Sequence, residues 1–353
     1  MDIPSDLNIA VIDPRDEPQW DEFVYQHREG TIFHTTSWTN VLADTFNYQP
    51  FYLVVREGDA IQAGLPLMRV KSWLTGNRLV SLPRTSYCDP LIQNGSGYHA
   101  LIKMVDDLVP ALHCRYAELK TLHHPELLEG TSGRRYSFFI NQTISLERDL
   151  SDIWRAFHRS CVRQRIQRAE DTGVQVRRGE TEDDLKLFHQ LHRKTTQKHM
   201  IPWRPFVFFQ NIQKQLFNDE RALLFIAEVQ DQPAAAAIAF AFKRNFIYEF
   251  LGLDDELLHY SAAHLLLWKS LCWAHEHGYR SFDFGLTPRE NQGLAKYKRR
   301  WGAEEQDVHY FYFPDLQGYK KAVLDDSVQN NGRSVFLQNI KRVLVSRLSR
   351  HFG

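Results

Sequence analysis

One order of secondary-structure elements occurs twice along this chain, and it limits the folds that the chain can adopt. Hydrophobic periodicity and turn residues predict two helices, three strands, a helix, a strand, a helix and a strand in the second half. The first half follows the same order. Because 353 residues exceed the usual size of one hydrophobic core, we expect two mixed α/β units, each with its own central sheet.

The predicted elements follow from alternating and helical hydrophobic patterns. In the first half we predict strands at 9–12, 51–56, 61–70, 78–82 and 116–120 and helices at 20–27, 36–46 and 98–113. In the second half we predict helices at 183–199, 205–217 and 261–277 and strands at 222–229, 234–242, 246–251, 281–284 and 307–313. A single long helix is predicted between the halves, from residue 150 to 171.

The stretch from Ser281 to Trp301 has the clearest functional pattern. A short apolar strand with one acid, Asp283, leads into a Gly-Leu-Thr-Pro turn, and Gly293 then precedes a basic helix that contains Lys298. A strand, a loop and a cationic helix in this order can hold an anionic substrate at the end of a sheet strand.

Four segments together resemble the Fem family. The last has the pattern Gly293-Leu294-x-x-Tyr297-Lys298-x-x-Trp301-Gly302, and the others are FHTTSWTNVLADTFNY, GLPLMRVKS and SCVRQRIQRAEDTGV. Fem enzymes have a GNAT-like fold and add amino acids to peptidoglycan precursors. The resemblance implies a tandem of two GNAT-like acyl-CoA N-acyltransferase units at 1–145 and 146–315, with the transfer site in the second, followed by a basic tail at 316–353.

The resemblance also assigns two catalytic residues, Tyr297 and Lys298, because an aromatic residue beside a lysine lies at the transfer site of Fem enzymes. A cation there can stabilise an oxyanion or hold the negative backbone of the donor. The alternative is a solvated helix face, which is common for a run of charges.

Two acids on predicted strands are candidates for the general base. Glu249 lies between apolar residues, and alternation places it on one face with Ile247 and Leu251 while Tyr248 and Phe250 take the other. Asp283 is flanked by phenylalanines in the same way. Burial would raise the pKa of such a carboxyl, as a base that accepts a proton from an amine requires. Either acid can instead be a structural carboxylate.

We assign substrate binding to the residues Arg163, Arg165, Arg168, His199 and Asn291. The arginines suit phosphate because a guanidinium donates two parallel hydrogen bonds, as a nucleotide-linked or lipid-pyrophosphate acceptor or a tRNA would require. They are equally compatible with a solvated helix face that contains local ion pairs, such as Arg168 with Asp171.

The donor is left open between acyl-CoA and aminoacyl-tRNA, with no tightly bound cofactor. Ser261 and Ala262 precede a predicted helix whose N-terminus can hold a pyrophosphate. The glycine-rich turn that usual GNAT enzymes place there is absent from LLHYSAAHLL, which argues against CoA. A long two-helix arm, found in some Fem enzymes that dock tRNA, is also absent from the predicted elements.

Composition restricts the cellular setting. The formal net charge is zero, so no global field attracts nucleic acid or membrane. Four separated cysteines and no metal-ligand spacing predict a reducing compartment without disulfides or zinc. The N-terminal residues do not resemble a signal peptide, so we expect a cytoplasmic protein. The basic tail is compatible with contact to the inner membrane face or with packing on its own domain.

These observations favour one function and leave two alternatives. The favoured function is acyl or aminoacyl transfer to an amine of a cell-wall or cell-surface polysaccharide precursor, such as a peptidoglycan precursor. The alternatives are aminoacyl transfer to protein N-termini and a non-catalytic module that binds an anionic glycan or RNA. The oligomeric state does not follow from the sequence.

Overall fold

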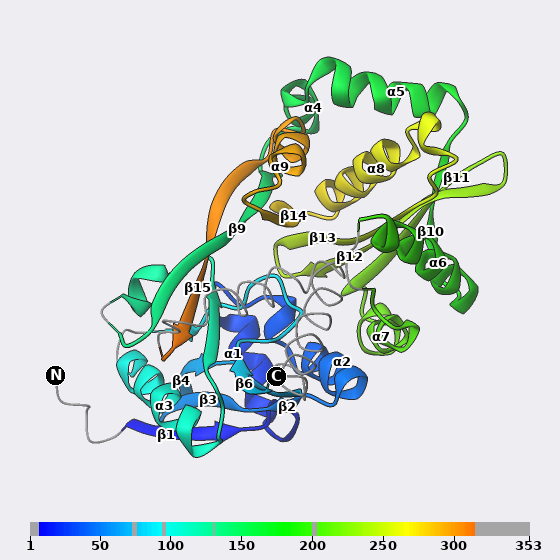
Figure 1. Ribbon diagram of the computed structural model, residues 1–353. Coiled ribbons are helices and arrows are strands. Elements are labelled where there is room, and N and C mark those ends of the chain that lie inside the picture. Colours follow the sequence, from blue (N-terminus) through cyan, green and yellow to red (C-terminus); the bar gives the residue numbers. More distant parts are fainter. Residues whose placement is uncertain (1–6, 73–75, 94–96, 130, 200–202, 315–353) are drawn as a thin grey trace, which may run out of the picture.

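The computed structural model describes residues 7–314 except 73–75, 94–96, 130 and 200–202 (Figure 1). The α-helices are α1 (Pro18–Gln26), α2 (Thr36–Phe46), α3 (Tyr98–Ala111), α4 (Leu150–Ala156), α5 (Gln164–Asp171), α6 (Glu182–Lys198), α7 (Phe206–Ile212), α8 (Ala262–Glu276) and α9 (Gln292–Arg299). Short 3-10 segments are Pro14–Asp16, Ile32–His34, Pro125–Leu128 and Leu258–Tyr260, and π-helical segments are Arg159–Arg163 and Gln213–Phe217.

The strands form two sheets. They are β1 (Leu7–Ile12), β2 (Gln49–Pro50), β3 (Tyr52–Glu57), β4 (Ala60–Leu65), β5 (Met68–Ser72), β6 (Gly76–Val80), β7 (Leu91–Ile92), β8 (Ala117–Thr121), β9 (Arg134–Ser145), β10 (Gln175–Gly179), β11 (Ala222–Val229), β12 (Gln232–Phe242), β13 (Asn245–Leu253), β14 (Ser281–Pro288) and β15 (Glu304–Phe313). The smaller sheet has the order β1-β3-β4-β7, and the larger has the order β10-β11-β12-β13-β14-β9-β15-β8-β6-β5-β2.

The larger sheet runs through both halves of the molecule. Strand β9 pairs with β14 and β15, and β15 also pairs with β8 of the first half. Figure 1 shows β9 and β15 as long strands that connect the lower and upper parts. The expectation of a separate central sheet in each half is therefore wrong, because these two strands continue one hydrogen-bonded ladder across the expected boundary.

Three large hydrophobic clusters hold the layers together. One lies between the halves, where α1 and α2 of the first half pack with α6, α7 and one face of β11–β13. The second covers the opposite face of β11–β13 with α5 and α8. The third joins α3 to β3, β4, β8 and β15 in the first half. Through the first cluster, the first half packs directly against one face of the β11–β13 part of the larger sheet.

Local signals explain where the helices of the second half begin and end. Thr181 and Asp184 form a reciprocal capping box at the start of α6. Gly278 follows α8 with a φ of +76°, a conformation that glycine adopts without steric cost.

The predicted long helix from 150 to 171 is wrong, because the backbone breaks at Phe157 and His158. Both residues are extended, and the His158 amide donates to the carbonyl of Arg300 instead of continuing a helix. The aromatic ring of Phe157 packs edge-on against Trp301, with the ring centroids 5.0 Å apart. Arg155 therefore lies on α4, whereas Arg163, Arg165 and Arg168 follow the break in the helix.

The limits of the two units at 1–145 and 146–315 stay predictions. The tail at 316–353 and its expected membrane contact lie outside the described residues. Among the described residues, no helix combines the length and the hydropathy that a membrane crossing requires.

Candidate active site

The site is built where two parallel strands of the larger sheet separate. β13 and β14 pair only at their first residues, where Asn245 to Ile247 lie opposite Ser281 to Asp283. Beyond this point the two strands no longer pair with each other, and side chains bond to some of their backbone groups instead: Lys298 donates to the carbonyls of Gly285 and Leu286, and His192 bonds to the carbonyl of Leu251. The end of the pairing is a place where a ligand can supply hydrogen-bond partners to the strand edges.

Each strand has a β-bulge at the point of separation. In β13, Glu249 is the extra residue, because Tyr248 pairs with Ala239 and Phe250 with Ile238. In β14, Phe284 and Gly285 interrupt the register with β9, and Gly285 has a φ of +69°. Bulges redirect side chains next to functional sites.

Because of the bulge at Glu249, the side chains of β13 do not alternate between the two faces as predicted. Ile247 and Phe250 pack in the cluster between the halves, whereas Tyr248 packs in the cluster with α8, and Leu251 lies against that same cluster. Simple alternation fails because the extra residue shifts the pattern by one position after Glu249.

One face of the separation, called the acid face here, contains the carboxylates of Glu249 and Asp283. Glu249 is half-buried and accepts hydrogen bonds from the Ser86 hydroxyl, with both oxygens 3.3 Å from Oγ. Asp283 is 2% exposed and accepts from Tyr87 Oη at 3.2 Å, Asn141 Nδ2 at 3.0 Å and the Gly285 amide at 2.6 Å. Asp283 is thus fully partnered, while Glu249 has one weak donor.

The two acids differ in how their pKa values suit proton transfer. Burial, and then the negative charge of Asp283, raise the pKa of Glu249 to about 7. Burial also raises the pKa of Asp283, against three hydrogen bonds and the charge of Lys298. Since a general base works best with a pKa near the operating pH, Glu249 fits this role better than Asp283.

Lys298 lies inside the protein, on the buried side of α9. Its side chain is 5% exposed, and Nζ donates to the carbonyls of Gly285 at 2.8 Å and Leu286 at 3.2 Å. Burial lowers the pKa of this lysine to about 8, although Asp283 and Glu249 favour its charged form. Lys296 is exposed, so only one of these two lysines points to the strand separation.

The opposite face, called the aromatic face here, contains Tyr248, Tyr297 and Trp301. The hydroxyl of Tyr248 and the indole N–H of Trp301 are buried and have no hydrogen-bond partner within the described part of the chain. Tyr297 packs edge-on against Trp301 and against His264 of α8, and burial raises the pKa of its phenol to about 12. Unpaired buried polar groups are costly, which indicates that a ligand completes this face.

The first half contributes residues to the site that we did not predict. Ser86 and Tyr87 hold the two carboxylates, and Arg84 lies close to Arg204, which precedes α7 and lies close to the charge of Glu249. Arg84 donates from Nε to Tyr48 Oη at 3.2 Å, and burial lowers the pKa of Arg204 to about 10. Neither arginine has an ion-pair partner among the described residues, so together they can receive an anion.

The predicted arginine segment lies over the aromatic face. Arg165 is exposed, and its charge affects the pKa of both Tyr297 and His264, so it is the arginine of this segment nearest to the site. Arg163 is half-buried with an unpaired Nε, and Arg168 is exposed. The alternative ion pair of Arg168 with Asp171 does not form, because Asp171 accepts from Gln167 instead.

Four further predicted residues lie apart from the carboxylates. His199 is exposed at the end of α6, and Asn291 caps α9 by accepting from the Leu294 amide at 3.1 Å. Ser261 and Ala262 are buried at the start of α8, and Ser261 has a φ of +60° with no side-chain cap. Their assigned roles stay predictions.

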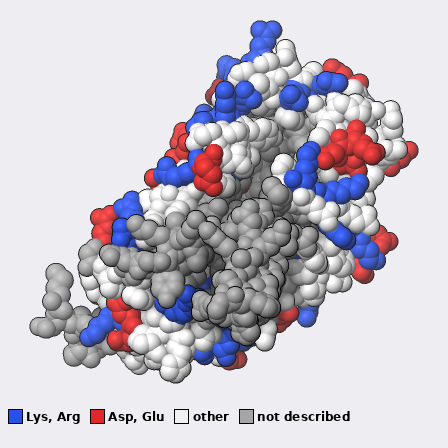
Figure 2. Space-filling model, viewed as in Figure 1, with Lys and Arg blue, Asp and Glu red and all other residues white. Residues whose placement is uncertain are grey.

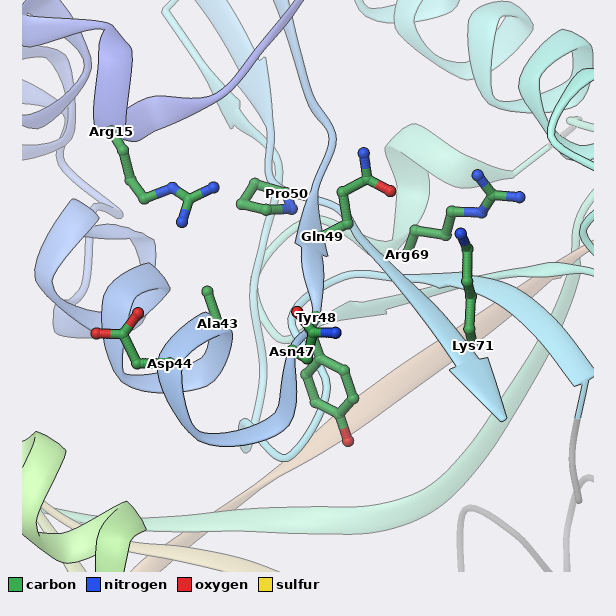
Figure 3. A pocket seen from close by; sticks show the side chains of 9 residues that line it. All are labelled: Arg15, Ala43, Asp44, Asn47, Tyr48, Gln49, Pro50, Arg69 and Lys71. Atoms are coloured by element: carbon green, nitrogen blue, oxygen red, sulfur yellow. The ribbon is translucent and has the colours of Figure 1, made fainter. Parts of the chain in front are cut away.

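A separate cavity of about 350 Å³ lies in the first half and does not include the site (Figure 3). It is lined by Arg15, Ala43, Asp44, Asn47, Tyr48, Gln49, Pro50, Arg69 and Lys71. In Figure 3 the guanidinium groups of Arg15 and Arg69 lie on either side of Pro50 and do not converge. No group of acids, histidines and cysteines suited to a metal ion occurs among the described residues.

Comparisons with known proteins agree with this architecture. Residues 156–299 match the acetyltransferase (GNAT) domain family, a segment that includes β13, β14 and all of α9. The crystal structure of FemX superposes with a TM-score of 0.68 at 15% identity, covering 89% of this chain and 99% of that one. The structure of L-PGS from Bacillus licheniformis superposes with a TM-score of 0.60 at 13% identity, covering 90% and 98%. The fold is a tandem of two GNAT-like units.

A sequence match to a curated enzyme indicates which acyltransferases the chain resembles. The UDP-N-acetylmuramoylpentapeptide-lysine N(6)-alanyltransferase of Weissella viridescens is 25% identical over 138 residues, which is 39% of this chain and 40% of that enzyme. The chain thus aligns with less than half of the relative that it matches. The chain is thus similar to this alanyltransferase over part of its sequence and to FemX in its fold, which supports a GNAT-like relationship to the Fem family.

Proposed function

We propose that this protein is an N-acyltransferase that moves an aminoacyl or acyl group to an amine of a peptidoglycan precursor. One observation carries the proposal: Glu249 lies on a β-bulge two residues beyond the last pairing of β13 with β14, and Lys298 donates to Gly285 of β14. The pKa of Glu249, near 7, lets this carboxylate accept a proton from an attacking amine at neutral pH. The match to an alanyltransferase supports the acceptor class.

The proposed chemistry is direct transfer. The acceptor amine attacks the carbonyl carbon of the donor ester or thioester, so that a C–N bond forms and the C–O or C–S bond breaks. Glu249 takes the proton from nitrogen, and a third N–H of Lys298, beyond the two that reach carbonyls, stabilises the developing oxyanion. The phenol of Tyr297, which stays protonated because its pKa is about 12, can return a proton to the leaving group.

The two faces suggest where each substrate binds. The aromatic face has unpaired donors next to Arg165, which suits a donor with a negative backbone. Figure 2 shows lysine and arginine side chains gathered at the top of the molecule, over α4, α5 and α9. Basic residues of this region that form no ion pair with the described residues include Arg159, Arg163, Arg165, Arg168, Lys296 and Arg300. This distribution favours aminoacyl-tRNA over acyl-CoA, because a polyanion contacts many separated cations.

At the acid face Arg204 lies close to Glu249 and Arg84 lies close to Arg204, which suits an acceptor that combines an amine with phosphate groups. A nucleotide-linked muramoyl peptide has both, and so does a lipid-linked precursor. The head group that they share is the part that this face recognises.

The test is a transfer assay with paired donors and acceptors. Alanyl-tRNA and acetyl-CoA, each with a labelled acyl group, are offered with UDP-N-acetylmuramoyl-pentapeptide or with a peptide that has a free N-terminal amine. We expect label on the lysine amine of the nucleotide-linked peptide from alanyl-tRNA. Label on the N-terminal peptide alone would replace the proposed acceptor, and binding of tRNA without transfer from either donor would contradict enzymatic function.

A further inference from the structure

The segment from Ser81 to Asp89 of the first half reaches into the site of the second half. It leaves the end of β6, where the Ser81 amide bonds to the Glu118 carbonyl, and returns along β8, where the Cys88 amide bonds to the Lys120 carbonyl. Between these anchors it presents the hydroxyls of Ser86 and Tyr87 to the two carboxylates. The acid face therefore depends on the conformation of a turn that belongs to the other half.

The backbone of this turn is strained. Leu82 has a φ of +53° and Arg84 a φ of +62°, and neither is a glycine. The left-handed region is unfavourable for side chains of this kind, and such residues persist only where their surroundings hold them. Leu82 is fully buried, so its side chain contributes to holding the turn.

The buried side chain of Lys120 fills the inside of the turn. Its Nζ donates to the carbonyls of Leu82 and Thr85, both at 2.8 Å, and the residue is only 4% exposed. Lys120 forms no ion pair within the described part of the chain, and the charges of Glu118 and Glu249 act on it only from a longer distance. A buried ammonium without a counter-ion is costly, because it loses its hydration and receives only neutral acceptors in return.

We propose that Lys120 is a positioning residue for the acid face: it closes the strained turn so that Ser86 and Tyr87 reach Glu249 and Asp283. The ammonium joins two carbonyls that flank both sides of the left-handed residue Arg84. Without it the turn loses its internal hydrogen bonds and relaxes towards ordinary backbone angles. The two hydroxyls then move away from the carboxylates.

Replacement of Lys120 should have two effects on the pKa of Glu249, and both raise it. The Ser86 hydrogen bond stabilises the charged carboxylate, and so does the nearby positive charge of Lys120. The groups that face this pair are Asp283, Arg204 and Lys298 around Glu249, and Glu118 and Cys88 around Lys120. Because Lys120→Met removes both stabilising effects, the pKa of Glu249 should rise above that in the unaltered protein.

The test reads Glu249 directly, without substrate. Carbon-13 NMR follows the titration of glutamate carboxyls in protein labelled at Cδ, and Glu249→Gln identifies the signal. In Lys120→Met the midpoint should rise by about 0.5–1 pH unit, the equivalent of one lost hydrogen bond. Hydrogen exchange should become faster in the peptide that covers 81–89 and stay the same in β11 and β12. Lys103→Met, at an exposed lysine of α3, is the matched control.

A double-variant cycle separates positioning from general loosening. If Lys120 acts through Ser86, then Ser86→Ala should raise the Glu249 midpoint in the unaltered protein but have a smaller effect in Lys120→Met. An unchanged midpoint, or fully additive effects, would overturn the proposal. Lys120→Gln, which keeps an amide donor and lacks the charge, serves the same comparison if Lys120→Met does not fold.

The proposal rests on the proposed function only where Glu249 is called the base. A shifted midpoint in a protein that transfers no acyl group would support Lys120 as a positioning residue and reject the transferase. Transfer that is unaffected by Lys120→Met, with an unchanged midpoint, would support the transferase and reject Lys120 as a positioning residue.

Discussion

The two faces of the β13–β14 separation differ in how their polar groups are satisfied. On the acid face both carboxylates accept hydrogen bonds from residues of the protein, and the first half supplies the hydroxyl donors Ser86 and Tyr87. On the aromatic face the Tyr248 hydroxyl and the Trp301 indole N–H are buried without partners among the described residues. The protein's own hydrogen bonds preorganise the two carboxylates, whereas Tyr248 Oη and Trp301 Nε1 are left for a ligand to complete, as are Asn141 Oδ1 and Arg204 Nε near the carboxylates.

This difference matters for catalysis because preorganised groups need no rearrangement when charge develops. The acid face is set before substrate arrives, whereas the aromatic face pays the cost of unpaired groups until a ligand binds. Variants of the base on the first face should therefore change rates, and variants of the unpaired groups of Tyr248 and Trp301 should change binding of the donor.

The largest expected effect belongs to Glu249→Gln. It removes the base, so kcat/KM in the transfer assay should fall by about 10²–10⁴-fold with little change in donor binding. Glu276→Gln, at an exposed acid of α8, is the control. Normal turnover in Glu249→Gln would assign the acid face a purely structural role.

The rate of the unaltered enzyme should depend on pH in a bell shape. Glu249 must be unprotonated, so activity should fall as the pH decreases through about 7. Lys298 must be charged, so activity should also fall as the pH increases through about 8. The alkaline limb should disappear in Lys298→Met, since no lysine remains there to lose its proton.

Lys298→Met should reduce turnover by about 10²-fold, because one lost preorganised donor costs roughly 2.7–4 kcal/mol. Lys296→Met, two residues away on the exposed side of α9, should leave turnover unchanged. If the Michaelis constant increases while turnover stays normal, Lys298 holds the donor instead of stabilising the transition state. Equal effects of the two variants would contradict its placement at the site.

Arg165→Ala tests binding of the donor at the aromatic face, and its expected effect is smaller than the effects of the preceding variants. Loss of one charge-assisted contact should weaken tRNA binding by about 1–3 kcal/mol and reduce its salt dependence. Thermal unfolding should hardly change, since exposed charges contribute little to stability. Arg193→Ala, at an exposed arginine of α6, is the matched control for a general loss of positive charge.

The two variants with the smallest expected effects, Tyr248→Phe and Tyr87→Phe, test the difference between the two faces most directly. Tyr248→Phe removes an unpaired buried hydroxyl, so the free energy of unfolding should stay the same or increase by about 1 kcal/mol. Tyr87→Phe removes a donor to Asp283, so that free energy should decrease by about 1–2 kcal/mol. Chemical denaturation without ligand measures both, and the same sign for the two variants would show that the faces do not differ in this way.

Much of the fold was predictable because hydrophobic periods are local. Helix α2 has the predicted bounds, and the core strands β11 to β13 agree to within two residues at most ends. Strand β9 was missed because 134–145 mixes arginines, polar residues and aromatics, and its strand character comes from pairing with β14 and β15. The predicted strand at 61–70 is two strands in different sheets, β4 and β5, and the chain turns at Pro66 between them.

The candidate site was predictable only in part. Glu249, Asp283 and Lys298 stand out as charges in apolar or signature segments, and the structure brings these three together. Ser86, Tyr87 and Lys120 have no such signal, since their roles depend on contacts between segments far apart in the chain. Pro83 and Arg84 mark a turn, but nothing local indicates that this turn meets β13.

The shared ladder has a consequence for how the protein is made. Strand β8 needs β15 as its neighbour, and β15 is synthesised after almost all of the second half. While the ribosome completes that half, β8 can pair on one side with β6 and with Cys88, and its other edge is open. Open strand edges invite pairing with other chains, and late, distant pairings slow folding. The first half therefore lacks one strand of its sheet until residues 304–313 have been synthesised, and we expect its open edge to be most prone to wrong pairing during that interval.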